Sequence, residues 1–137
     1  MRERDIVFVR GPSLLITDDD RAFRETLRDV LRPKGFRTLL AGDGEEAVRI
    51  IHSEVIHLVL MDMHMPKLTG LEALRQVRQH SSRLPCILIS ADLNETILAE
   101  ARQVKVFAVL SKPVTRVQVT EAVGMAMQQT YNWPRAG

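Results

Sequence analysis

The chain contains a single cysteine, Cys86, among its 137 residues, and this excludes an internal disulfide. Cys86 lies in an apolar run, so we interpret it as a buried structural thiol of a protein from a reducing compartment, and we expect a cytoplasmic location. Aromatic side chains are also scarce, at 4% of the residues, which argues against the stacking platforms that bind single-stranded nucleic acid.

Long apolar runs and an excess of one charge are missing as well. No stretch approaches the roughly 20 apolar residues that cross a bilayer, and the N-terminus has no secretory signal, so no membrane contact is predicted. The 19 basic and 17 acidic side chains leave a net charge of only +2. We interpret the arginines that recur at helical spacing as one solvated helix face, and we predict no direct contact with nucleic acid: Arg21, Arg24, Arg28 and Arg32.

Short apolar runs alternate with segments of helical periodicity. The runs predict strands over residues 14–17, 37–41, 57–61, 86–89 and 106–110, and a helical pattern follows each of them. Near-continuously apolar strands in serial βα units predict an α/β fold, namely a flavodoxin-like, doubly wound (βα)5 domain whose five-stranded parallel sheet has the order 2-1-3-4-5. We expect the domain to cover residues 13–129, between an N-terminal extension over residues 1–12 and a tail over residues 130–137.

Polar side chains stand where the apolar runs end, and ligands of an open parallel sheet bind outside the carboxyl ends of its strands. Two adjacent carboxylates at a strand end repel each other unless a cation lies between them, and hard cations such as Mg²⁺ take oxygen ligands. Helix capping is the alternative role for an acidic run, but Asp20 could fill it alone. The residues that we expect to converge on one site are Asp18, Asp19, Asp62, Ser90 and Lys112.

The types of these side chains suit the transfer of a phosphoryl group. Asp62 can act as a nucleophile and form an acyl phosphate. Lys112 would place a fixed positive charge against phosphoryl oxygens, and Ser90 would donate a hydrogen bond to one of them. The plainer interpretations are a turn carboxylate for Asp62, a solvated loop lysine for Lys112 and simple strand termination for Ser90.

Together these residues resemble the receiver domain of bacterial two-component response regulators. The motifs that carry the resemblance are LLITDDD, VLMDMHMP followed by Gly70, ILISAD and LSKP. The resemblance implies that Asp62 is the phosphoacceptor, and that Asp19, Asp62 and the backbone carbonyl of His64 ligate Mg²⁺, with Asp18 acting mainly through a coordinated water. It implies that Ser90 and Lys112 bind the phosphoryl group, and that His64 and Asp92 modulate its lifetime.

The resemblance also implies partners and an output. A histidine kinase or phosphotransfer protein would supply the phosphoryl group, and the chain would catalyse only its own phosphorylation and dephosphorylation. The output would be a switch in the binding of a downstream protein or output domain, with a phosphorylation-dependent homodimer as a further alternative. Two other functions stay open, namely an interaction module that works without phosphorylation and a small phosphatase-like enzyme.

Three features fall outside this pattern. Receivers often carry an aromatic residue three positions before the lysine of the fifth strand, where this chain has Val109. Phe107 lies two residues earlier and would share a strand face with Val109, so we hypothesise that it takes over part of the coupling. The histidines His52, His57 and His80 show no metal-ligand spacing and are interpreted as surface or helix-end residues. The tail, with Tyr131 and Trp133, either folds back onto the domain or docks on a partner.

Overall fold

The computed structural model describes residues 8–134, which form a five-stranded parallel sheet in the order β2-β1-β3-β4-β5. The fold class and the strand order predicted from the sequence are confirmed. The strands are β1 (Ser13–Thr17), β2 (Arg37–Ala41), β3 (Leu58–Asp62), β4 (Cys86–Ser90) and β5 (Ala108–Ser111). The helices are α1 (Arg21–Leu31), α2 (Gly44–Ser53), α3 (Gly70–His80), α4 (Glu95–Gln103) and α5 (Arg116–Tyr131), and a 3-10 turn, η1 (Arg32–Lys34), follows α1.

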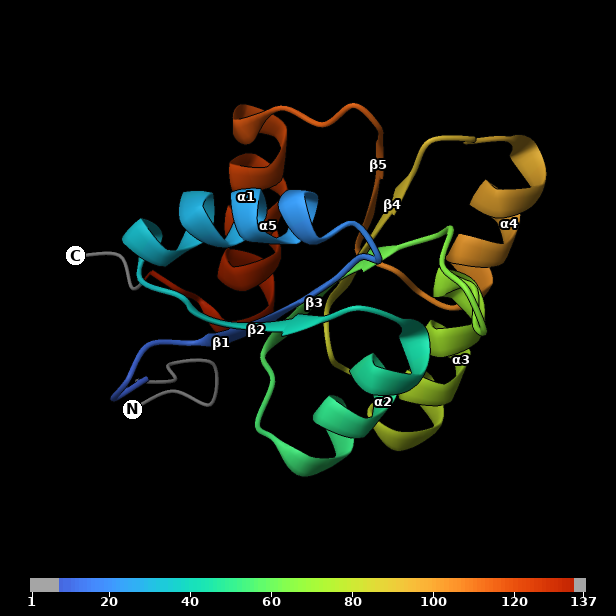
Figure 1. The fold of residues 1–137 in the computed structure, drawn as a ribbon. Coiled ribbons are helices and arrows are strands. Elements are labelled where there is room, and N and C mark those ends of the chain that lie inside the picture. Colours follow the sequence, from blue (N-terminus) through green and yellow to red (C-terminus); the bar gives the residue numbers. More distant parts are fainter. Residues whose placement is uncertain (1–7, 135–137) are drawn as a thin grey trace.

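Helices cover both faces of the sheet, because the central strands are apolar on both sides. One layer consists of α1 and α5, and the other of α2, α3 and α4 (Figure 1). Alternate residues of β1 enter opposite cores: Leu14 and Ile16 face α1 and α5, whereas Leu15 faces the other layer. Each fully buried leucine of this kind contributes about 1.5–3 kcal/mol through removal of apolar surface from water.

Each helix begins at a polar residue whose side chain accepts a hydrogen bond from a backbone N–H of the first turn. Asn94 caps α4 by accepting from the N–H of Ile97, and Asp20 caps α1 by accepting from the N–H of Phe23. Thr69 and Thr115 form capping boxes with the residues three positions on, Glu72 and Gln118. Because each α-helix follows a parallel strand, the helix N-termini lie on the side of the sheet where the strands end (Figure 1).

The guanidinium of Arg78 joins the C-terminal ends of α3 and α4. It donates hydrogen bonds to the carbonyls of Val104 (2.8 Å) and Lys105 (2.9 Å) after α4, and to that of Leu84 (2.6 Å) before β4. The last four carbonyls of an α-helix lack partners within the helix. Arg78 binds the carbonyl of the C-cap residue of each helix, because it also donates to the carbonyl of Ser81 at the end of α3 (3.3 Å). The ends of the two helices are therefore held to each other and to the start of β4.

The described part of the tail folds back onto the domain, so the first of the two alternatives holds for residues up to 134. The hydroxyl of Tyr131 donates to the carbonyl of His57 at 2.8 Å, and the ring of Tyr131 packs edge-on against those of Phe8 and His57. Trp133 packs against Phe36, with ring centroids 4.8 Å apart. Residues 1–7 of the expected extension and 135–137 of the tail lie outside the described residues, and the domain boundaries stay a prediction.

The expectations for Phe107 and His57 are wrong. Phe107 does not share a face with Val109, because Phe107 packs in the layer of α1 and α5 and Val109 in the opposite layer. The strand begins only at Ala108, so its alternation does not extend back to Phe107. His57 is not a surface histidine: it is half-buried, and its Nδ1 accepts from the N–H of Ser13 at 2.9 Å.

Candidate phosphoryl-transfer site

The three consecutive aspartates after β1 have different surroundings. Asp18 is buried, with 1% of its surface exposed, whereas Asp19 and Asp20 are exposed. The backbone of Asp18 is fixed from two sides, because its N–H donates to the carbonyl of Ala41 (3.1 Å) and its carbonyl accepts from Nη1 of Arg24 (2.6 Å). Its carboxylate accepts from the N–H of Asp20 at 2.9 Å. One carboxylate is thus held inside the sheet edge, and a second lies beside it in solvent.

Asp62 ends the central strand β3 and is 3% exposed. The loop after it returns close to its backbone at Gly70, whose N–H donates to the carbonyl of Met63 at 2.9 Å. A Cβ placed on Gly70 would lie 2.4 Å from the carbonyl oxygen of Asp62, so only glycine allows this approach. The backbone that carries the Asp62 carboxylate is therefore enclosed by its own loop.

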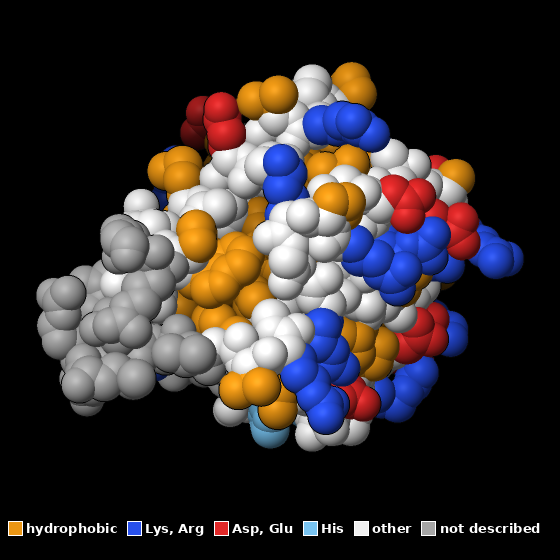
Figure 2. Space-filling view, turned by 90° about the vertical axis from the view of Figure 1, so that its left-hand side faces the viewer, with side chains coloured by type: hydrophobic (Ala, Val, Ile, Leu, Met, Phe, Trp, Pro, Cys, Tyr) orange, Lys and Arg blue, Asp and Glu red, His pale blue; other side chains and the backbone are white. Residues whose placement is uncertain are grey.

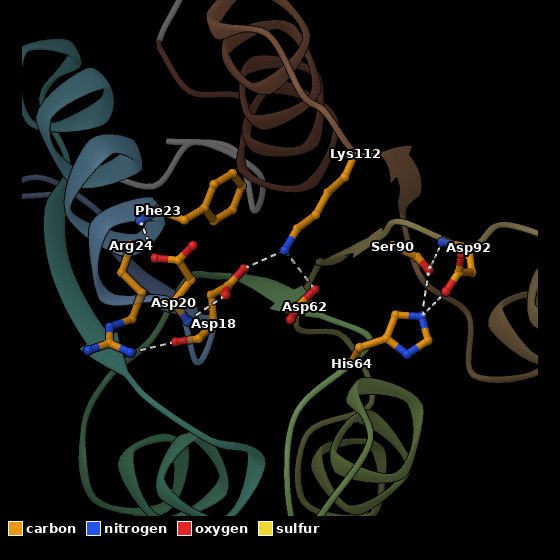
Figure 3. A network of polar contacts seen from close by, with 9 residues as sticks. All are labelled: Asp18, Asp20, Phe23, Arg24, Asp62, His64, Ser90, Asp92 and Lys112. Carbon is orange, nitrogen blue, oxygen red and sulfur yellow. Dashed lines mark hydrogen bonds and ion pairs between the residues drawn. The ribbon is translucent and has the colours of Figure 1, made fainter.

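Lys112 follows β5 and reaches across the sheet edge to both buried carboxylates (Figure 3). Its Nζ lies 3.0 Å from Oδ2 of Asp18 and 3.1 Å from Oδ1 of Asp62. Its backbone N–H donates to the carbonyl of Ser90 at 2.9 Å, which fixes the start of the side chain. Burial lowers the pKa of Lys112, but its hydrogen bonds to Asp18 and Asp62 and their charges outweigh this effect, so its pKa is raised. Lys112 is a charged bridge, and the plainer interpretation as a solvated loop lysine is wrong.

The three carboxylates form a set that fits a hard divalent cation. Asp18, Asp19 and Asp62 each offer an oxygen, and these oxygens lie within 4.8 Å of one another. Burial raises the pKa of Asp62, and the charges of Asp18 and Asp19 raise it further, against the lowering effect of Lys112. One ammonium therefore does not fully compensate the negative charge, and oxygen donors of this kind are the ligands that Mg²⁺ prefers. The carbonyl of His64 as a further ligand stays a prediction.

Ser90 ends β4, and its hydroxyl is directed toward His64 and Asp92 rather than toward Asp62 (Figure 3). The oxygen accepts from the N–H of Asp92 at 3.2 Å and lies 3.5 Å from Nε2 of His64. The same ring nitrogen lies 3.5 Å from Oδ2 of Asp92. Ser90 itself is fully buried.

Comparison with known proteins decides the family. A model described as the response regulator receiver domain matches residues 14–124. The chain belongs to this family. Receivers act in two-component phosphorelay signalling, where phosphorylation of an aspartate is their general function, and they are not classical enzymes.

The curated relatives match this receiver over only part of their own length. It is 34% identical over 104 residues to the Regulator of RpoS of Escherichia coli K12, covering 76% of this chain and 31% of that protein. It is 44% identical over 78 residues to the response regulator MprA of Mycolicibacterium vanbaalenii, covering 57% of this chain and 34% of that one. The aligned part thus spans about a third of each curated relative.

Two solved structures show the likeness of the fold. A CheY-like receiver from Methanospirillum hungatei superposes with a TM-score of 0.86 at 20% identity, covering 89% of this chain and 98% of that one. CheY of Borrelia burgdorferi, solved as a CheX-CheY-BeF3-Mg²⁺ complex, superposes with a TM-score of 0.79 at 28% identity, covering 85% and 89%.

Two residues of the receiver site escaped the sequence analysis, because both belong to helical patterns. Arg24 was interpreted as part of a solvated arginine face, but its guanidinium turns inward to the carbonyl of Asp18. Phe23 lies within the helical pattern that follows the first predicted strand and was not singled out, but its ring lies over the Lys112 ammonium, with its centroid 4.6 Å from Nζ. The capping of α1 by Asp20 is the signal that could have found them, because it places the next turn beside the acidic run.

The remaining arginines of α1 pair with acidic neighbours. Arg21 lies 3.0 Å from Glu25, and Arg28 lies 3.1 Å from Asp29. On the face drawn in Figure 2, basic side chains of the described residues lie next to acidic ones instead of forming one continuous field. Exposed pairs of this kind contribute little to stability. No helix among residues 8–134 has the length and apolar character needed to cross a membrane.

The fold unites two histidines that the sequence separates. The rings of His52, at the end of α2, and His80, at the end of α3, have centroids 4.3 Å apart. The expectation that they are exposed helix-end residues holds. Within residues 8–134, however, no third carboxylate, thiol or imidazole joins the pair in a cluster suited to a metal ion.

We expect replacement of Asp62 by asparagine to raise the free energy of unfolding by about 1 kcal/mol at neutral pH in the presence of a chelator. Because the pKa of Asp62 is raised above its ordinary value of 3.8, the protonated carboxyl stabilises the fold at low pH. That contribution is lost as the pH rises through the raised pKa, whereas asparagine stays neutral. Urea unfolding at pH 7 and near pH 4 should show the gain at the higher pH alone.

The exposed Asp92 is a matched control for this change, because its side chain is 80% exposed and 3.5 Å from the nearest histidine nitrogen. We expect Asp92→Asn to change stability by less than about 0.5 kcal/mol at either pH. A loss of stability in Asp62→Asn at pH 7 would contradict the assignment of an excess negative charge to the site.

Proposed function

We propose that the chain accepts a phosphoryl group on Asp62 from a histidine kinase or phosphotransfer protein, in the presence of Mg²⁺, and thereby switches the binding of a downstream protein or output domain in the cytoplasm. The observation that carries the proposal is the bridge of Lys112 between two buried carboxylates, 3.0 Å from Asp18 and 3.1 Å from Asp62. A purely structural lysine has no need of two buried partners beside a third, exposed carboxylate. The family supplies the reaction class.

The transfer would proceed by attack of Asp62 on phosphorus. Lys112 contacts Oδ1, so we assign Oδ2 as the nucleophile. A bond forms between Oδ2 and phosphorus while the bond from phosphorus to the donor's imidazole nitrogen breaks, and the electron pair of that bond stays with the imidazole. Asp18, Asp19 and Asp62 would hold Mg²⁺, which supplies charge neutralisation between the carboxylates and the phosphoryl oxygens. Lys112 would exchange a carboxylate oxygen for a phosphoryl oxygen.

Ser90 would connect the modification to a change of surface. Its hydroxyl bonds to the Asp92 backbone and lies next to His64 when Asp62 is unmodified. A phosphoryl group adds about −1.5 to −2 charge and strong acceptor oxygens, so the hydroxyl would turn toward it and release the loop that begins at Asp92. A switch requires only two arrangements of the surface, one of which phosphorylation stabilises more than the other.

Intact-mass spectrometry after incubation with acetyl phosphate and Mg²⁺ tests the proposal. We expect one labile phosphoryl adduct in the unaltered chain and in Asp92→Asn, and no adduct in Asp62→Asn. The matched control removes a carboxylate that lies near the site but outside the acidic set. Omission of Mg²⁺ should slow the reaction by at least about tenfold, because phosphoryl transfer depends on neutralisation of charge.

Other outcomes favour the alternatives. A chain that never forms an adduct, but still binds its partner, would be an interaction module that works without phosphorylation. Steady hydrolysis of unrelated phosphoesters would indicate a phosphatase-like enzyme. An adduct that persists in Asp62→Asn would place the phosphoacceptor elsewhere.

A further inference from the structure

The aromatic ring of Phe23 closes one side of the Lys112 ammonium. Phe23 lies in the first turn of α1, where its N–H donates to the capping carboxylate of Asp20 at 3.2 Å. Its ring centroid lies 4.6 Å from Nζ of Lys112, on a different side from the two carboxylates (Figure 3). The face of an aromatic ring carries negative electrostatic potential, so a cation at this distance is attracted to it.

We propose that Phe23 is a positioning residue for phosphoryl transfer, whose ring holds the Lys112 ammonium over the acidic pocket. The inference rests on the proposed function of Asp62. Lys112 carries its charge on four flexible carbons, and a quarter of its side chain is exposed (26%). The two carboxylates attract the ammonium inward, and the ring limits its movement outward while adding an attraction of its own.

The ring differs from the carboxylates in what it does during the reaction. When a phosphoryl group reaches Asp62, the ammonium has to exchange a carboxylate oxygen for a phosphoryl oxygen. Phe23 accepts no hydrogen bond that would have to break, so its attraction for the ammonium persists before and after the exchange. Without the ring, the ammonium gains conformations directed into solvent, and fewer of its positions suit the transfer. Phe23 forms and breaks no bond itself.

Packing alone is the competing explanation, because Phe23 also contacts the apolar cluster between α1, α5 and the sheet. Phe36 serves as a control for packing: it is 6% exposed in the same cluster, and its ring makes an edge contact with Trp133 instead of Lys112. A role in packing predicts that loss of either aromatic ring lowers stability with no effect on the chemistry. A positioning role predicts that the rate of phosphorylation depends on the negative electrostatic potential at the face of the Phe23 ring.

The experiment compares initial rates of phosphorylation by acetyl phosphate in the full chain. We expect Phe23→Leu to react about 3- to 10-fold more slowly, and Phe23→Tyr, which keeps the ring face, to react within about twofold of the unaltered chain. Phe36→Leu should be less stable and equally fast. Phenylalanines with one, two and three ring fluorines at position 23 keep nearly the same volume, and the logarithm of the rate should fall with each fluorine.

A rate that does not respond to fluorination, or a Phe23→Leu variant that is folded and as fast as the unaltered chain, would overturn the proposal. A second measurement separates this failure from failure of the proposed function. The ring current of Phe23 should shift the ε-methylene protons of Lys112 upfield in the NMR spectrum of the unphosphorylated chain with chelator, and Phe23→Leu should remove the shift. If the shift is present and no variant is phosphorylated, it is the assignment of Asp62 that fails.

Discussion

Replacing Lys112 by methionine should lower the free energy of unfolding by about 3 kcal/mol at pH 7, and it should abolish phosphorylation. Removal of one partner of a buried ion pair leaves an uncompensated charge, and here two carboxylates lose their shared ammonium. The loss of stability should become smaller as the pH falls. The pKa of Asp62 is already raised, and protonation of its carboxylate removes its repulsion with Asp18. Urea unfolding in a chelating buffer at several pH values measures both effects.

Lys67 provides the matched control for Lys112. It also lies near two carboxylates, Asp43 at 3.7 Å and Glu45 at 3.9 Å, but its side chain is 59% exposed. We expect Lys67→Met to cost less than about 1 kcal/mol. The double variant Lys112→Met/Asp62→Asn should recover part of the loss, since residues in one ion-pair network are not additive. Equal losses in the two lysine variants would show that the bridge has no special energetic role.

Replacing Gly70 by alanine should both destabilise the domain, by about 2–3 kcal/mol, and impair phosphorylation at Asp62. The added Cβ would lie 2.4 Å from the carbonyl oxygen of Asp62 and 2.9 Å from Cα of Met63, and both atoms belong to the backbone. Side-chain rotation cannot relieve such a contact, so either the loop or the end of β3 has to move. Thermal unfolding and the rate of acetyl phosphate labelling report the two consequences.

Gly124 is the control glycine, because it lies within α5 and a Cβ there would meet nothing within 4 Å. We expect Gly124→Ala to stabilise the receiver by about 0.5–1 kcal/mol, since alanine loses less backbone freedom in a helix. Its labelling rate should stay unchanged. If Gly70→Ala unfolds like the unaltered chain and is labelled at the same rate, the close approach at Asp62 does not constrain the site.

The candidate site could be predicted from the sequence because it depends on a rule of topology. In a parallel sheet all carboxyl ends lie on one edge, so the order of the strands is sufficient to bring Asp18, Asp62 and Lys112 together. The strands themselves are short and mostly apolar. The boundaries of β2 match the prediction, and those of the other strands differ from it by one or two residues. At the start of β5 this small difference placed Phe107 on the wrong face.

The features that could not be predicted depend on the direction in which a side chain points from its helix and on which neighbour it meets. The helical spacing of Arg24 is the same as that of its solvated neighbours, and only the position of α1 over the sheet edge shows that it points to the carbonyl of Asp18. The rings of His52 and His80 meet because α2 and α3 pack side by side and end at the same level. Such contacts arise from packing between helices, for which a periodic pattern gives no register.

The hydrogen bonds of Arg78 have a consequence for how a signal would travel through α4. The C-terminal end of this helix is fastened to α3 and to the start of β4, while its N-terminal end follows directly on the loop at Asp92. A helix fastened at one end responds to a push at the other by swinging about the fixed point. A small shift at the sheet edge would therefore appear on the surface as a tilt of α4, largest at Asn94 and smallest near Val104.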